Sequence, residues 1–182
     1  MTPPPIVVAE IGCNHCGDMN TAKEMILTAA TYCKADYVKF QKRCNKELLS
    51  PDEYNAPHPV PANSYGKTYG EHREFLEFSA DQHRQLMAWC REHGIGYATS
   101  IWDVTSAREM FALKPAYLKI PSACNLNFAL LDALCREYAG DIHISFGMTT
   151  HAEEEEIVSF LEKRGAAKRA VLYSCTSGYP VP

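Results

Sequence analysis

The stretch Asp36-Tyr37-Val38-Lys39-Phe40-Gln41 decides the fold class, because its residues alternate as in a β-strand whose two sides differ. Val38 and Phe40 fall on one side of this strand, which is therefore apolar. Lys39 and Gln41 fall on the other side. A strand of this kind buries its apolar side against helices and turns its polar side toward a separate, partly enclosed space.

Five other strand-like runs occur along the chain, and segments with helical apolar spacing lie between them. The six runs begin near Ile6, Asp36, Ile95, Ala116, Asp141 and Ala170. This repeated strand and helix pattern predicts a parallel sheet, in either a doubly wound open sheet or a closed (β/α)8 barrel. The interval after the second run is longer than one strand and helix unit. Its prolines predict a long ordered loop over about residues 43–79.

Charged residues occupy the polar side of three of these strands. Glu10, Lys39 and Lys119 would project from different strands into one shared, partly desolvated space, where unpaired charges are costly. Such a cluster is either a structural ion network or a functional site. The excess positive charge favours a receptor for a compact anion such as a phosphate or a carboxylate. Three hydroxyl residues would lie beside the two lysines: Ser100, Ser122 and Ser145. No glycine-rich nucleotide-binding loop is present, which argues against a nucleotide and weakens the doubly wound alternative.

The composition is typical of one globular domain and excludes several classes of protein. Of the 182 residues, 46% are hydrophobic and 22% are charged. The net charge is −4 with scattered lysines and arginines, so no nucleic-acid partner is expected. No apolar run approaches the roughly 18 residues of a membrane helix, and residues 1–5 lack the pattern of a signal peptide. A soluble cytoplasmic protein is therefore expected. The eight cysteines are expected to be reduced thiols, and Cys13 and Cys16 are interpreted as loop cysteines rather than a metal or redox site.

Several motifs occur in the order of a known family across almost the whole chain. The opening motif, Ala9-Glu10-Ile11-Gly12-Cys13-Asn14-His15-Cys16-Gly17, resembles the AEIGxNHxG opening of the N-acetylneuraminate (sialic acid) synthase family. The strand quoted first resembles the ADxVKFQ strand of the same family. The other matches are Tyr69-Gly70-Glu71-His72-Arg73, Ser100-Ile101-Trp102-Asp103, Lys119-Ile120-Pro121-Ser122, Ser145-Phe146-Gly147-Met148 and Cys175-Thr176-Ser177-Gly178-Tyr179-Pro180.

The resemblance implies a fold, an activity and a cofactor. The fold is a parallel (β/α)8 barrel of the TIM type. The implied enzyme condenses phosphoenolpyruvate with N-acetylmannosamine or a related hexosamine, releases phosphate and leaves a nine-carbon 2-keto sugar acid. A divalent metal, Mn²⁺ or Mg²⁺, and a homodimer are also implied by the resemblance.

The resemblance also assigns roles to polar residues of this chain. The implied catalytic residues are Glu10, Lys39 and Lys119. The implied substrate-binding residues are Gln41, Ser100, Ser122, Ser145 and Tyr179, with the serines facing phosphoenolpyruvate and the tyrosine facing the sugar. His15 is expected to shape the loop after the first strand.

One position departs from the family pattern. Cys124 stands where many members carry Glu, two residues after Ser122. Loss of an acidic side chain there would alter metal or sugar contacts. The identity of the hexosamine therefore stays open, and a synthase of legionaminic or pseudaminic acid is an alternative.

The chain reaches a sixth expected strand at about residues 170–176. A (β/α)8 barrel typically takes about 250 residues, so residues 1–182 are expected to form a partial barrel domain with about six strands and five helices. The two histidines that bind the family's metal and the family's C-terminal antifreeze-like domain are expected to be absent. No synthase turnover is expected from this chain alone, and release of phosphate from phosphoenolpyruvate with Mn²⁺ and N-acetylmannosamine would contradict that. A further alternative is a non-catalytic phosphate-binding module that pairs with a second chain.

Overall fold

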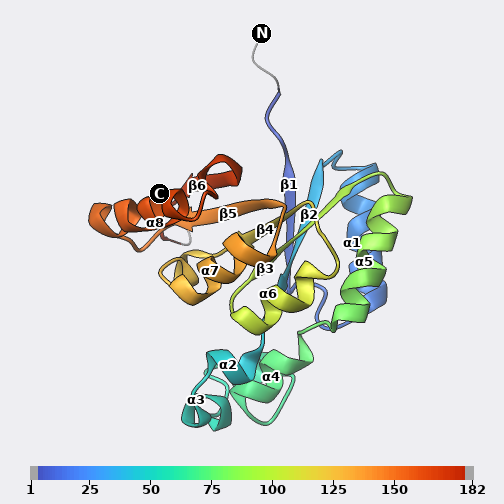
Figure 1. Ribbon diagram of the computed structural model, residues 1–182. Coiled ribbons are helices and arrows are strands. Elements are labelled where there is room, and N and C mark those ends of the chain that lie inside the picture. Colours follow the sequence, from blue (N-terminus) through green and yellow to red (C-terminus); the bar gives the residue numbers. More distant parts are fainter. Residues whose placement is uncertain (1–3, 179–182) are drawn as a thin grey trace. The chain divides into compact units, whose positions relative to one another are not determined.

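A computed structural model describes residues 4–178 of the chain (Figure 1). It contains a six-stranded sheet in which the strand order is the chain order. The pairings of β1 with β2, β4 with β5 and β5 with β6 are parallel. The strands are β1 (Val8–Gly12), β2 (Tyr37–Lys42), β3 (Gly96–Ile101), β4 (Tyr117–Ile120), β5 (Asp141–Phe146) and β6 (Ala170–Ser174). The predicted α/β fold with six strands is confirmed, and within the described residues the sheet is not a closed barrel.

Five main helices follow the first five strands, as the sequence predicts. They are α1 (Met19–Thr31), α5 (Ala80–Glu92), α6 (Val104–Phe111), α7 (Phe128–Glu137) and α8 (His151–Lys163). The start of α5 is fixed by a capping box: the Ser79 hydroxyl accepts from the Gln82 N–H at 3.3 Å, and Gln82 Oε1 accepts from the Ser79 N–H at 2.8 Å.

The segment predicted as a long loop over residues 43–79 contains short helices. These are α2 (Asn45–Leu48), α3 (Pro51–Asn55), a 3-10 turn η1 (Pro61–Asn63) and α4 (Tyr69–Phe75). Ser50 forms a capping box with Glu53, and Pro51 occupies the first position of α3, where a proline is tolerated. A methyl group on Gly70 would lie 2.3 Å from the ring of Tyr54, so only glycine lets α4 pack this closely against α3.

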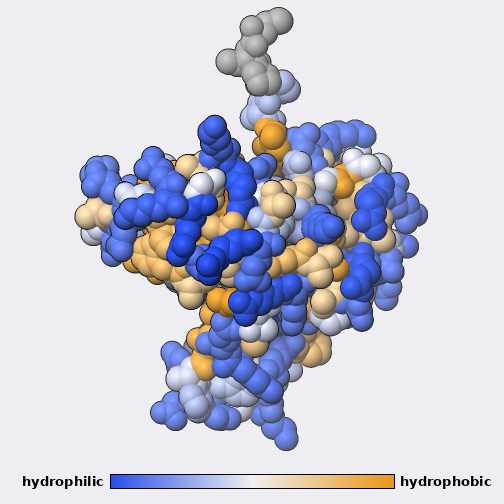
Figure 2. Space-filling view, in the orientation of Figure 1, coloured by the Kyte–Doolittle hydropathy of each residue, from blue (hydrophilic) through white to orange (hydrophobic). Residues whose placement is uncertain are grey.

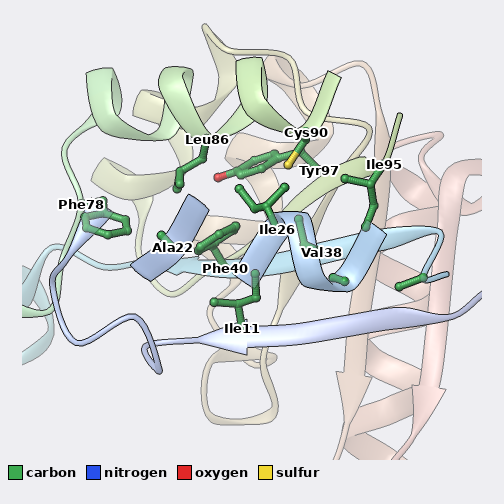
Figure 3. Close-up of a cluster of buried hydrophobic side chains, with 12 residues drawn as sticks. Ile11, Ala22, Ile26, Val38, Phe40, Phe78, Leu86, Cys90, Ile95 and Tyr97 are labelled. Atoms are coloured by element: carbon green, nitrogen blue, oxygen red, sulfur yellow. The ribbon is translucent and has the colours of Figure 1, made fainter. Parts of the chain in front are cut away.

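The chain separates into two compact units, Met1–Thr99 and Ser100–Pro182, where the sequence predicts one partial barrel domain. In the first unit, apolar side chains of β1, β2, α1 and α5 form a core with β3 (Figure 3). Its members include Ile11, Ile26, Val38, Phe40, Leu86 and Tyr97. In the second unit, buried apolar side chains come from β4, β5, α7 and α8: Leu118, Ile120, Leu130, Leu134, Ile142, Ile144 and Ile157.

Two polar residues form a buried pair inside the first core. His83 Nδ1 on α5 lies 2.5 Å from the Tyr97 hydroxyl on β3. Burial lowers the pKa of His83 to about 3, so the ring is neutral at pH 7 and the tyrosine donates to it. The neutral pair packs well in the core, but a second proton on the imidazole would place a buried positive charge there and destabilise the fold.

Figure 2 shows hydrophilic residues spread over most of the visible face, with apolar residues scattered among them. Across residues 4–178, the helices are all too short or too polar to cross a bilayer.

Candidate active site

The pairing of β1 with β2 brings two predicted site residues together in the first unit. Glu10 and Lys39 are partners in the parallel register of the two strands, and their side chains form a salt bridge. Lys39 is 12% exposed and Glu10 is 52% exposed, so the ammonium group is the more enclosed member. An ion pair at this depth holds both side chains in a defined place, while the carboxylate still faces solvent.

Gly12 lets a third predicted residue join this pair. The register slips between Glu10 and Gly12, and Gly12 has a φ of +56°, which favours glycine. A methyl group there would lie 3.2 Å from Gln41 Nε2 and 3.4 Å from Glu10 Oε1. Gln41 Oε1 is buried and accepts no hydrogen bond from residues 4–178. Glu10, Lys39 and Gln41 are therefore one polar cluster, named here the β1–β2 cluster.

The loop after β1 is held by a buried aromatic contact. His15 is 3% exposed and stacks on Phe78 with 4.0 Å between ring centres. The Gly17 N–H donates to His15 Nδ1 at 3.1 Å. Burial lowers the pKa of His15 to about 4, so the ring is neutral at pH 7. These contacts fix the shape of the loop from Gly12 to Gly17.

A buried ion pair anchors the same loop to both ends of the 43–79 segment. The guanidinium of Arg43 pairs with Glu77, and the Arg43 N–H donates to Glu77 Oε2 at 3.0 Å. Arg43 Nη2 also lies 3.1 Å from Cys13 Sγ. The two charged side chains are only 12% and 10% exposed. Burial raises the pKa of Glu77 against the opposing effect of Arg43.

A pocket of about 400 Å³ lies in the second unit and contains three of the predicted site residues. These are Lys119 from β4, Ser122 just after it, and Ser145 near the end of β5. The rest of the lining is Trp102, Pro121, Ala123, Met148, Cys175, Thr176 and Ser177. A lysine among hydroxyl groups is a suitable receptor for a small anion. We name this cavity the Lys119 pocket.

Gly147 lies beside two of the hydroxyl groups that line the Lys119 pocket. A methyl group on Gly147 would lie 2.6 Å from Ser122 Oγ and 2.6 Å from Ser177 Oγ. The two hydroxyls therefore face one another across this glycine. Asn125, which is buried, donates from Nδ2 to the Ser145 carbonyl at 2.9 Å and to the Gly147 carbonyl at 3.2 Å.

His143 is a neighbour of Lys119 that the sequence analysis did not select. It is the register partner of Lys119 on β5, stacks on Tyr117 at 3.8 Å, and has Nδ1 2.7 Å from the Tyr173 hydroxyl. The Lys119 ammonium lies 5.8 Å from the centre of the Tyr173 ring. Burial lowers the pKa of His143, and the nearby Lys119 charge acts in the same direction. The alternation of residues along β5 puts His143 on the polar side of the strand, and this pattern could have identified it from the sequence.

Other predicted residues have different outcomes. Ser100 is 4% exposed and does not line the Lys119 pocket. Tyr179 lies outside the described residues. The convergence of Glu10, Lys39 and Lys119 on one cavity stays a prediction, because the first two belong to one unit and the third to the other.

The implied Mn²⁺ or Mg²⁺ does not find a matching site in the part of the chain that the structure describes. Within residues 4–178, no three His, Cys, Asp or Glu side chains are grouped so that they could hold an ion. We therefore derive no chemistry through a metal. The polar groups of the two sites described above include lysine ammonium, hydroxyl, amide and thiol groups and a single carboxylate.

Comparison with known proteins identifies the family. Residues 25–182 match the model of the NeuB family. The chain belongs to the NeuB family. The NeuB-family chain is 37% identical over 177 residues to the N-acetylneuraminate-9-phosphate synthase of Drosophila melanogaster, covering 96% of this chain and 46% of the relative. It is 33% identical to the synthase of the same name from Homo sapiens, covering 98% of this chain and 48% of the relative.

This NeuB-family chain is also similar to a synthase of a different product and to a solved structure. The N,N'-diacetyllegionaminic acid synthase of Campylobacter jejuni is 30% identical over 97% of this chain and 53% of the relative. Among solved structures, a sialic acid synthetase from Leptospira borgpetersenii, crystallised in complex with citrate, has a TM-score of 0.81 at 26% identity. That match covers 99% of this chain and 57% of the other. The chain spans about half the length of the curated relatives it matches.

Proposed function

We propose that this NeuB-family chain takes part in the condensation of phosphoenolpyruvate with N-acetylmannosamine or a related hexosamine, giving a nonulosonic acid and phosphate. The observation that carries the proposal is the Lys119 pocket, which combines one ammonium group with several hydroxyls in a small cavity. Phosphoenolpyruvate is a compact molecule with a phosphate and a carboxylate, and both groups suit such a site. The citrate complex of the Leptospira relative supports an anion site in this fold.

The reaction requires charge to be held in place while bonds change. The methylene carbon of phosphoenolpyruvate attacks the aldehyde carbon of the open-chain sugar. Water adds to the resulting cationic carbon, and the tetrahedral intermediate collapses with loss of phosphate. In the proposal Lys119 and Lys39 hold negative charge through these steps, and Glu10 orients the sugar or moves a proton.

The proposal assigns binding roles to the uncharged residues as well. Ser145 is 4% exposed and lines the Lys119 pocket. Ser122 faces the same space. Gln41 presents a buried amide oxygen in the β1–β2 cluster. We propose all three as substrate contacts, together with Ser100 and Tyr179.

The sugar is the open part of the proposed function. A nine-carbon product takes three carbons from phosphoenolpyruvate and six from the hexosamine, so its carbon 9 is carbon 6 of the sugar. The relatives named N-acetylneuraminate-9-phosphate synthases make a product with phosphate at that carbon, and the phosphate must come from the sugar because that of phosphoenolpyruvate is released. A hexosamine 6-phosphate is therefore one candidate, and the legionaminic precursor indicated by the Campylobacter relative is another.

The cellular setting is part of the same proposal. All eight cysteines are free thiols in the structure, which is typical of a reducing compartment. A biosynthetic enzyme of this kind would act in the cytoplasm, and we propose the homodimer that the resemblance implies.

Replacing Lys119 with Gln tests the proposed function. The change removes the ammonium group of the pocket but keeps the side-chain stem. We expect it to weaken binding of phosphoenolpyruvate by about tenfold to a hundredfold, the typical contribution of a charge-assisted hydrogen bond. Isothermal titration calorimetry of the chain measures the affinity. Lys168→Gln, on an exposed turn of the second unit, is the matched control. Absence of saturable phosphoenolpyruvate binding by the unaltered chain would contradict the proposal.

Gly147→Ala gives a second test of the same pocket. Its added methyl group would lie 2.6 Å from the hydroxyls of Ser122 and Ser177, so both must shift and the cavity must shrink. We expect phosphoenolpyruvate affinity to fall by about tenfold while thermal unfolding stays cooperative. Ala152→Ser adds one atom at an exposed position on α8 and serves as the control. An unchanged affinity would show that phosphoenolpyruvate does not bind in the part of the pocket beside Gly147.

A further inference from the structure

A connected group of four side chains, named here the His143 cluster, lies on three neighbouring strands of the second unit: Tyr117 and Lys119 of β4, His143 of β5 and Tyr173 of β6. The His143 ring stacks on that of Tyr117, with 3.8 Å between ring centres and 9° between ring planes. The Tyr173 hydroxyl lies 2.7 Å from His143 Nδ1. The Lys119 ammonium lies over the Tyr173 ring, 5.8 Å from its centre. Each member therefore contacts the next, and the last contact reaches the lysine of the Lys119 pocket.

The His143 cluster lies on the side of the strands that carries the Lys119 pocket. Leu118 and Ile142 are fully buried, and the residues next to them along each strand point the opposite way. His143 is the register partner of Lys119, so it shares this side with Lys119 and Ser145, which both line the pocket. His143 does not itself line the pocket. It is therefore placed to act on a bound anion through the lysine rather than by contact.

The Tyr173 ring limits the freedom of the Lys119 ammonium group. A lysine carries its charge at the end of a flexible four-carbon stem, and the rotamer freedom of that stem is lost when the ammonium binds a ligand. A cation within about 6 Å of a tyrosine ring centre is attracted to the face of the ring. Because Tyr173 offers such a face, part of this freedom is already lost before a ligand binds.

His143 fixes the Tyr173 ring at its hydroxyl end. In the tautomer that carries its proton on Nε2, His143 accepts the hydrogen bond of the Tyr173 hydroxyl at Nδ1, and stacking on Tyr117 holds the imidazole in place. Burial lowers the pKa of His143, against the effect of Asp141 and together with that of the Lys119 charge. A neutral imidazole holds the tyrosine without placing a second cation beside the lysine.

We infer that His143 is a positioning residue of the Lys119 pocket: acting through Tyr173, it holds the Lys119 ammonium group where the pocket receives an anion. This inference rests on the proposed function, in which that ammonium binds phosphoenolpyruvate, and adds to it a residue that does not touch the ligand. It also accounts for a histidine and a tyrosine at half-buried positions, where apolar side chains would lose less hydration on folding.

Calorimetric titration of three variants with phosphoenolpyruvate tests the inference. His143→Leu removes the hydrogen bond to Tyr173, and we expect it to weaken binding by about threefold to tenfold, the typical cost of ordering one long side chain. Tyr173→Phe keeps the ring but loses the hydroxyl, so a similar loss is expected. His143→Asn places an amide oxygen near the position of Nδ1 and should keep the affinity within about twofold of that of the unaltered chain.

The Lys119→Gln background distinguishes a positioning role from a purely structural one. If His143 acts through the lysine, His143→Leu should change the affinity of Lys119→Gln by less than about twofold, because the group that it positions is gone. A purely structural role predicts the same fractional loss in both backgrounds. Tyr173→Phe repeats the comparison with a smaller change of shape, and thermal unfolding shows whether each variant folds.

Tyr138→Phe is the matched control. It also removes a hydrogen-bonded tyrosine hydroxyl from the second unit, one that donates to the Pro115 carbonyl at 2.7 Å. Tyr138 does not line the Lys119 pocket, so the affinity for phosphoenolpyruvate should stay unchanged.

A ligand-free measurement tests the inference independently of phosphoenolpyruvate. In NMR spectra the Tyr173 ring should shift the ε-methylene protons of Lys119 upfield of those of the exposed Lys168, and Lys119→Gln identifies the signal. His143→Leu should move this signal toward that of Lys168, and His143→Asn should retain it. An unmoved Lys119 signal in His143→Leu, or an equal fractional loss of affinity in both backgrounds, overturns the inference. Absence of phosphoenolpyruvate binding counts against the proposed function alone, since the Lys119 signal still decides the role of His143.

Discussion

Acidification below pH 6.5 is expected to lower the free energy of unfolding by about 1.4 kcal/mol per pH unit for each of two buried imidazoles. These are His15, stacked on Phe78, and His83, bonded to Tyr97. Burial lowers their pKa values to about 4 and about 3. In the unfolded chain both rings take up a proton near pH 6.5, whereas the folded chain resists protonation. The stabilisation is therefore complete above pH 6.5 and is lost as the pH falls toward 4.

Urea unfolding at pH 7, 6 and 5 measures this slope. His83→Gln should remove the part of the slope that His83 contributes, because this titrating ring is gone while a side chain that can accept from Tyr97 remains. His151→Gln, on the exposed start of α8, should leave the slope unchanged. A slope that His83→Gln does not alter would contradict the expectation.

Glu77→Ala is expected to destabilise the first unit by about 3–5 kcal/mol, because it leaves Arg43 buried without its counter-charge. The loss should extend to the loop after β1, since the same guanidinium contacts Cys13. Denaturant unfolding at pH 7 measures the change. Asp81→Ala removes one partner of the exposed Arg84 pair and should cost less than about 1 kcal/mol.

A double variant separates the two causes of this loss. Arg43→Met combined with Glu77→Leu removes both charges and fills similar volume, so it should recover most of the stability. If the double variant is as unstable as Glu77→Ala, the ion pair itself carries the stabilisation. If Glu77→Ala costs no more than Asp81→Ala, the pair is effectively solvated.

Local signals were sufficient to predict much of the fold. The alternation of Val38 and Phe40 with Lys39 and Gln41 identified β2, whose apolar members are fully buried. The capping residue Ser79 marked the start of α5. These features depend on neighbours within a few residues, so they can be read from the sequence.

The 43–79 segment shows why some elements were missed. Its prolines were interpreted as loop signals, but Pro51 begins α3 directly after the cap Ser50, where a proline fits. The capping box from Ser50 to Glu53 was a visible signal for this helix. The division into two units within β3 carries no comparable local pattern.

The sequence predicted which residues belong to the candidate site better than it predicted the contacts that those residues make. The strand alternation placed Lys119 and Ser145 on one side, and both line the same pocket. The stacking of His143 on Tyr117 depends on which strands become neighbours. The pairing of Arg43 with Glu77 joins residues 34 positions apart, and no local rule selects that partner.

Asn125 has a consequence for how tightly a ligand can be held. Its amide is bonded to two carbonyls at the end of β5, so the backbone beneath the Lys119 pocket is ordered before any ligand arrives. The conformational entropy of that backbone is already lost on folding and is not lost again on binding. Because this backbone is already ordered, little of the binding free energy from the lysine and serine contacts is lost on ordering it.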